Sequence, residues 1–389
     1  MTADQPATPE RRLTRHADVR AVLADPRFLV PAAPAAQPGS GMAWLRGAVS
    51  RFSNGAEHAH RRARVAELID ALDPVRLRRE ARERAVAELA GGARVDVMAR
   101  IARRVPVGVL ATALGVPQGR REEVAEAVTA MAAAYHLPPA PSTTTGAASP
   151  EAASPGAASP GAASPGAVSP DNAAVAVLAG ALAGALGDGL GDGRQPDPGL
   201  LAAVAAALIQ ACDATAGLVG NTLAVVTRLP ADLSVRWPVE ALLTETLRWD
   251  PPVRLTRRVA AEDATAGGVL VPAGAVVVLD LAAANRDPEV FPDPHRFDPA
   301  RVDPARVDPA RVDAGRVDSD GRGGGHLGFG SGIRPCPGEG AALALAAGVV
   351  EAALAHRLAD PEIPYEPSPN LRVPACLHLE SAATVKGPR

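Results

Sequence analysis

Apolar residues recur every three or four positions along most of this chain, which is the spacing of one face of an α-helix. The pattern therefore predicts helices over most of the length. The segments in which the spacing is most regular are 16–23, 58–72, 74–89, 95–114, 118–134, 173–186, 200–227, 239–249 and 340–358.

Segments typical of strands are few. Residues 253–260 and 276–281 are expected to be strands, and the second follows the turn Pro272-Ala273-Gly274. Apolar residues make up 47% of the chain but aromatic residues only 3%, and strands favour aromatic side chains. The expected fold class is mainly α with small β-sheets, in one domain over residues 1–389.

Two stretches of five-residue repeats interrupt the helical pattern. Within 142–171 the unit is Ala-(Ala/Val)-Ser-Pro preceded by Gly or Glu, and within 298–325 it is Asp-Pro-Ala-Arg-Val, followed by a glycine run. Proline at this frequency is incompatible with a helix, and a five-residue unit is too short for a solenoid repeat. Both stretches are predicted to be low-complexity inserts in the single domain.

The charges are nearly balanced, with 40 basic and 43 acidic residues and a net charge of -3. This balance provides no general attraction for nucleic acid or for an anionic membrane, so neither is expected as a partner. The first residues lack the apolar core of a signal peptide, and no apolar run reaches the ~20 residues of a membrane helix. Three widely spaced cysteines do not form a disulfide framework. We therefore expect a cytoplasmic protein.

The segment most specific for a function is the glycine-rich stretch 326–338, which contains Cys336 and precedes an Ala- and Leu-rich helix. A lone cysteine is most often an inert buried residue. Here the glycines allow turns, and the first amides of the following helix favour a thiolate. This setting suits a metal ligand. Zinc is a weak alternative, because no Cys-x-x-Cys or paired histidines lie beside Cys336.

The glycine-rich stretch resembles the cysteine-ligand loop of the cytochrome P450 family, F-G-x-G-x-R-x-C-x-G. Upstream, Glu245 and Arg248 match the E-x-x-R motif of that family, and Arg296 lies in a counterpart of its meander motif. The resemblance implies that Glu245, Arg248 and Arg296 form a structural ion-pair triad. The positions that match the loop motif are Phe329, Gly330, Gly332, Arg334, Cys336 and Gly338.

Two further matches concern the cofactor. His58 and Arg62 resemble the family's H-x-x-x-R motif, and Arg258 lies in a stretch similar to one that supplies another arginine. The resemblance implies haem b bound through its propionates, with Cys336 as the iron ligand. Any one of these arginines alone would be read as a solvated side chain, but all of them occur in the order of the family. The cofactor-binding residues implied in this way are His58, Arg62, Arg258, Phe329, Arg334, Cys336 and Gly338.

The resemblance implies an enzyme that activates O2 and oxidises a small organic substrate, a haem-thiolate monooxygenase. Its electrons would come from a ferredoxin-type donor and its reductase. The expected catalytic positions are Asp213 and Ala214, where the family usually has an acid followed by Thr. Thr215 is rotated by ~100° from the missing hydroxyl. Oxidative coupling or dehydrogenation without oxygen insertion therefore stays open, as does a non-catalytic haem sensor.

Overall fold

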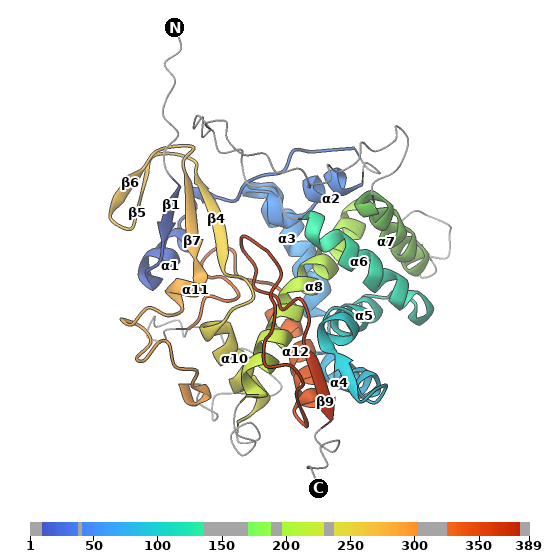
Figure 1. Cartoon of the computed structure of the whole chain (residues 1–389). Coiled ribbons are helices and arrows are strands. Elements are labelled where there is room, and N and C mark those ends of the chain that lie inside the picture. The colour runs from blue at the N-terminus through green and yellow to red at the C-terminus, as the bar shows by residue number, and fades with distance from the viewer. Residues whose placement is uncertain are drawn as a thin grey trace, which may run out of the picture.

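A computed structural model describes residues 10–37, 41–135, 170–187, 197–228, 237–301 and 325–381 (Figure 1). The predicted fold class is confirmed, because helices dominate and the sheets are small. The helices are α1 (His16–Ala24), α2 (Met42–Ala48), α3 (Gly55–Asp70), α4 (Pro74–Leu89), α5 (Val105–Ala113), α6 (Arg121–Tyr135), α7 (Pro170–Gly187), α8 (Pro198–Val226), α10 (Val239–Trp249), α11 (Leu281–Ala284) and α12 (Glu339–Ala353).

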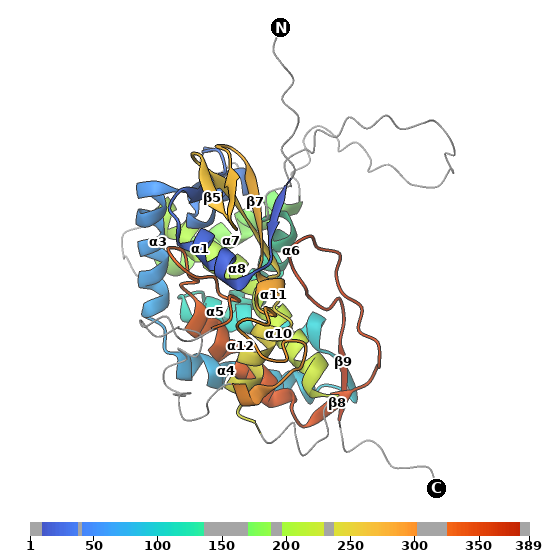
Figure 2. The same ribbon diagram turned by 90° about the vertical axis from the view of Figure 1, so that its left-hand side faces the viewer.

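The strands form three separate sheets. A four-stranded sheet has the order β1-β7-β4-β2, in which β1 pairs parallel with β7 and the other pairs are antiparallel. This sheet and the β5–β6 hairpin lie at one end of the molecule, and the sheet β3-β9-β8 lies at the other (Figure 2). The strands are β1 (Arg11–Leu13), β2 (Phe28–Leu29), β3 (Arg94–Asp96), β4 (Leu255–Ala260), β5 (Ala264–Ala266), β6 (Val269–Val271), β7 (Val276–Asp280), β8 (His356–Leu358) and β9 (His378–Ser381).

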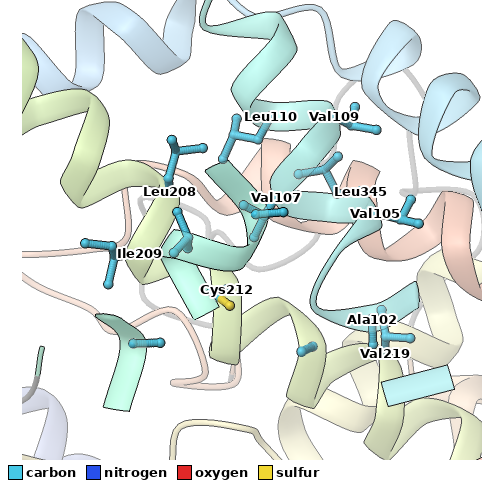
Figure 3. Packing of buried hydrophobic residues seen from close by; sticks show 14 of the residues in the cluster. Ala102, Val105, Val107, Val109, Leu110, Leu208, Ile209, Cys212, Val219 and Leu345 are labelled. Atoms are coloured by element: carbon cyan, nitrogen blue, oxygen red, sulfur yellow. The ribbon is translucent and has the colours of Figure 1, made fainter. Parts of the chain in front are cut away.

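Helix α8 is the central element of the core, and α3, α5, α6, α10 and α12 all pack against it. It is long and apolar enough to cross a membrane by composition alone, but 72% of its most apolar window is buried in the protein. Figure 3 shows Leu208, Ile209 and Cys212 of this helix beside the side chains of α5. These contacts explain its apolar surface as that of a core helix.

Sequence signals explain where helices begin. Asp73 precedes α4 and accepts hydrogen bonds from the amides of Val75 and Arg76, and Asp197 accepts from the Gly199 amide at the start of α8. Each aspartate is followed by proline, which suits the first helical position because its missing N–H would have no partner there.

Two of the predicted helices are wrong in extent. The expected helix 95–114 is divided into β3, a π-helical turn (Met98–Ala102) and α5. Val95 alternates with charged residues and pairs with Leu379 of β9, so sheet pairing outweighs the helical spacing. The expected helix 340–358 ends at Ala353, because His356–Leu358 form β8 against β9. Of the repeats, 142–169 and 302–324 lie outside the described residues.

Helices α4 and α12 cross in direct backbone contact at Gly348. A Cβ atom at this position would lie 2.2 Å from the carbonyl oxygen of Arg78 and 2.9 Å from the amide nitrogen of Arg82. Glycine is therefore required by the close approach of the two helices. The same crossing fixes the position of α12, which begins directly after the Cys336 loop.

We predict that Gly348→Ala lowers the free energy of unfolding by about 1–3 kcal/mol, because the added methyl group would push the two helix backbones apart. Gly180→Ala is the matched control, since this helical glycine has open space around it; it should be neutral or stabilising by up to about 1 kcal/mol. Urea denaturation of both variants measures the difference. Equal stability of the two variants would contradict the close crossing.

Candidate functional site

The Cys336 loop is folded back on itself by backbone hydrogen bonds. The Cys336 amide donates to the Phe329 carbonyl at 2.8 Å, and Gly330 and Gly332 adopt positive φ angles of 74° and 66°. At Gly332 a Cβ atom would lie 2.4 Å from the carbonyl oxygen of Leu23 in α1. Glycine is thus needed at this position both for the turn and for the contact with α1.

The start of the loop is anchored by buried polar side chains. Asn285 accepts a hydrogen bond from the Leu327 amide at 2.7 Å, and the His16 Nε2 lies 3.1 Å from the Gly325 carbonyl. His326 is buried, and its Nδ1 accepts from the Gly328 amide at 3.2 Å. These contacts fix the loop between α1, α11 and the core.

Cys336 lies three residues before the first residue of α12, and part of the residue's surface is exposed. Protein atoms packed around the thiol raise its pKa to about 11, although the Gly338 amide lowers it. Burial and the Gly338 amide act on this pKa in opposite directions, and a thiolate at Cys336 stays a prediction that depends on a bound metal. Metal binding would have to displace the proton. Gly338 leaves room beside the sulfur, because its Cβ atom would be 4.0 Å from Sγ.

Four basic side chains surround the loop. Arg334 donates to the Ser53 carbonyl at 2.7 Å and to Asn54 Oδ1 at 3.0 Å, and Arg62 of α3 donates to the Pro335 carbonyl. His58 lies one turn before Arg62, and burial lowers its pKa, with smaller contributions from the charges of Arg334 and Arg62. Burial also lowers the pKa of Arg258 of β4, and the charge of Arg334 adds to this effect. We call His58, Arg62, Arg258 and Arg334 the four-cation cluster.

The four-cation cluster contains unused hydrogen-bonding capacity. The Nδ1 of His58 lies 3.0 Å from the Ser50 carbonyl and so donates to it, while the buried Nε2 has no partner among the described residues and donates to an anion only when the ring is protonated. Arg258 is 6% exposed and donates only to Thr256 and to the Arg257 carbonyl of its own strand. Burial lowers its pKa to about 10.

An anion is the missing partner of this cluster. Within the described residues, the hydrogen bonds of its members go to carbonyls, an amide and a hydroxyl and none goes to a carboxylate. Buried cations without a counter-charge are costly, and a bound anion offsets that cost. The propionate groups of a haem, whose iron would face Cys336, fit this donor set.

Glu245 and Arg248 form a buried bidentate ion pair. The Arg248 Nε and Nη2 donate to the two carboxylate oxygens at 2.8 and 2.7 Å, and the side chains are 1% and 3% exposed. Arg296 contributes its backbone carbonyl, which accepts from Arg248 Nη2 at 2.9 Å, while its own residue is exposed. Instead, Arg301 Nε lies 3.5 Å from Glu245. Among the described residues, Arg301 is thus the second cation near Glu245, and Arg296 contributes its backbone carbonyl.

The two expected catalytic positions lie on the middle turns of α8. Asp213 Oδ1 is 3.6 Å from the Nε of Arg103, whose Nη2 donates to Glu366 at 2.6 Å. Burial raises the pKa of Asp213 and Arg103 lowers it. Ala214 is half-buried, whereas Thr215 is buried with a hydroxyl that has no partner among the described residues. Asp213 is therefore shared with a charge network that reaches the surface at Glu366.

The residues that the sequence analysis missed act through tertiary contacts. Arg301 belongs to the first Asp-Pro-Ala-Arg-Val unit, which looked like repeat sequence only. Arg103 and Asn285 carry no motif of their own, and their roles come from contacts with Asp213 and Leu327. One usable signal was Asn285 in Ala284-Asn-Arg-Asp-Pro288, since Asn, Asp and Pro close together are typical of an ordered turn.

The fold and the cation-lined cysteine loop define a helical protein suited to an anionic prosthetic group. Residues 233–350 match the family model described as cytochrome P450. CalO2 and P450BioI, the latter in complex with a fatty-acid-ligated acyl carrier protein, superpose over 95% of this chain and 90% and 92% of theirs. Their TM-scores are 0.72 and 0.71, at 21% and 20% identity.

Curated relatives match a smaller part of this chain than these solved structures do. The putative cytochrome P450 140 of Mycobacterium tuberculosis is 45% identical over 97 residues, which are 23% of this chain and 22% of the relative. The 6-deoxyerythronolide B hydroxylase of Saccharopolyspora erythraea is 35% identical over 135 residues, 34% of this chain and 28% of that enzyme. The matched region thus spans about a quarter of these relatives. The resemblance to the cytochrome P450 family is confirmed, and the chain has its fold.

We predict that Arg258→Gln stabilises the haem-free chain but speeds haem loss by about tenfold or more, because it removes a buried cation that only an anion compensates. Arg257→Gln is the matched control on the same strand; its side chain pairs with Glu10 at 2.9 Å and should affect neither property. Urea unfolding without haem and haem transfer to an acceptor protein measure the two effects. A less stable haem-free Arg258→Gln chain would show that this arginine is purely structural.

A pH dependence follows from buried His326, whose pKa is lowered to about 4 by burial and then by Arg248. The unfolded histidine, with a pKa near 6.5, takes up its proton first. The free energy of unfolding should therefore fall by roughly a few kcal/mol between about pH 6.5 and 4. His326→Gln should flatten this slope, and His60→Gln, at an exposed position, should not. An unchanged slope in His326→Gln would refute this.

Proposed function

We propose that this chain is a haem-thiolate monooxygenase that oxidises a small organic substrate with O2. Cys336 would hold the iron of haem b, and the four-cation cluster would hold its propionates. When bound, the haem supplies the oxidising chemistry, which a thiolate ligand promotes by donating electron density. The protein would work in the cytoplasm, with electrons from a ferredoxin-type donor and its reductase.

The single observation that carries this proposal is the four-cation cluster beside Cys336. It joins side chains from α3, β4 and the Cys336 loop, which are far apart in the sequence, and the described residues leave the buried Arg258 guanidinium without an anion. A lone structural cysteine would not need this surrounding. Phe329 supports the same arrangement, because its carbonyl receives the Cys336 amide and its ring packs on the core.

The residues of α8 would handle protons on the other side of the haem. Asp213 is the one acid available at the expected place, and its contact with Arg103 and Glu366 links it to the surface. Ala214 has no hydroxyl to relay a proton onward. Ordered water or a substrate hydroxyl would have to complete the path, as general acid catalysis requires contact or one bridging water.

Ala214 also favours a second candidate, oxidative coupling or dehydrogenation of the substrate without oxygen insertion. Such a reaction removes hydrogen from the substrate and needs less controlled proton delivery. The relative named as a hydroxylase supports oxygen insertion. The two are separated by a reaction under labelled oxygen with a substrate found by spectral screening: label in the product supports the monooxygenase, and an oxidised but unlabelled product supports coupling.

We predict that Ala214→Thr increases the fraction of electrons that end in product, because it restores a hydroxyl next to Asp213. Ala211→Thr, one turn away on the same partly open face of α8, is the control for added polarity alone. The measurement compares product formed with reduced cofactor consumed. Equal or lower coupling in Ala214→Thr would count against a proton-relay role for this position.

A further inference from the structure

A recess is lined by residues of α2, α3 and the start of α8, and we call it the α2–α3–α8 recess. Figure 1 labels the three helices. Its volume is about 190 Å³, and neither the Cys336 loop nor the four-cation cluster lines it. Its lining residues come from four segments, with Trp44 and Ala48 from α2, Val49 and Ser50 after it, His60, Arg61, Arg64 and Val65 from α3, and Pro198, Gly199, Ala203 and Ala206 from α8.

The floor of the recess is apolar and rigid. Trp44, Val49 and Val65 are 8%, 2% and 6% exposed, and Ala203 and Ala206 present only methyl groups. A cavity of about 150 Å³ with such walls accepts a molecule the size of benzene. The recess therefore has room for the apolar part of a small organic molecule.

The rim of the recess is basic. His60 is exposed, and the Arg61 and Arg64 side chains are 21% and 33% exposed. None of the described residues that line the recess is acidic. The acids that pair with the two arginines, Glu57 and Asp197, are 62% and 51% exposed, so water screens these pairs on the outside.

Hydrogen bonds hold the side chains of Arg61 and Arg64 in place and use only some of their N–H donors. Arg61 donates through Nη1 to the Val49 carbonyl and through Nη2 to Glu57, which leaves its Nε without an acceptor among the described residues. Arg64 donates only through Nη2, to Asp197. Its Nη1 lies so close to Gly199 that a Cβ atom there would be 2.6 Å away. The guanidinium thus lies over the first turn of α8, at the mouth of the recess.

These features select the chemistry of an occupant. A neutral apolar molecule would leave the arginine donors unused, and an inorganic anion would leave the floor unfilled. We propose that the α2–α3–α8 recess is a binding site for a small amphipathic organic anion, such as a medium-chain carboxylate. The carboxylate accepts from Arg61 and Arg64, and the chain lies against Trp44 and Ala203. This site does not depend on haem or on the oxidation proposed above.

The test is calorimetric titration of the purified, haem-loaded full chain with octanoate, with octanol and octylamine as neutral and cationic probes. Octanoate is expected to bind one to one and more tightly than the other two. Arg64→Gln should weaken octanoate binding by about tenfold or more, since a charge-assisted hydrogen bond is lost. Ala203→Leu should weaken it by filling the floor. Arg64→Lys should restore part of the affinity.

The control variant is Arg79→Gln on α4, which removes a more exposed arginine from an i,i+4 pair and should not change binding. Equal affinity for octanol, or octanoate binding that survives both Arg64→Gln and Ala203→Leu, would overturn the proposal. So would an octanoate-dependent shift of the haem absorption with the same affinity in Arg64→Gln, because that would place the ligand beside the iron. The haem spectrum without octanoate reports the proposed function separately.

Discussion

Burial of positive charge without a matching negative charge is the constraint on which the site depends. Arg258 is almost fully buried on β4, Arg334 stands on the Cys336 loop, and His58 and Arg62 come from α3. Burial disfavours the charged form of Arg258 and, together with the nearby charges of Arg334 and Arg51, lowers its pKa to about 10. The fold thus holds uncompensated positive charge near Cys336. This arrangement is expected where a dianionic prosthetic group binds.

The rest of the fold keeps that arrangement rigid. Gly332 lets the Cys336 loop lie against α1, and Asn285 and His16 hold the start of this loop. Arg248, which is paired with Glu245, donates to the Pro294 carbonyl and so connects α10 to the segment that precedes the loop. Gly348 allows α12 to approach α4 directly. Preorganisation of this kind matters because a cofactor site must exist before the cofactor binds.

Sequence alone predicts the parts of the structure that local chemistry determines. The bounds of α4 and α10 follow from helical spacing and, for α4, from an aspartate cap. The glycines around Cys336 are enough to predict the turns of that loop. Contacts between distant segments are not encoded locally. The spacing of residues 95–114 fits a helix, but in the structure Val95 pairs with β9. In the sequence Arg301 is one arginine of a repeat, and only the structure shows that it lies beside Glu245. The charge network of Asp213 with Arg103 is hidden for the same reason.

The most direct measurement is the absorption spectrum of the purified protein, first oxidised and then reduced under carbon monoxide. If Cys336 binds haem iron as a thiolate, the reduced carbon monoxide complex shows a Soret band strongly shifted to the red of that of a histidine-ligated haem, and Cys336→Ala lacks this band. Absence of haem, or a histidine-type spectrum in the unaltered chain, would contradict ligation by Cys336.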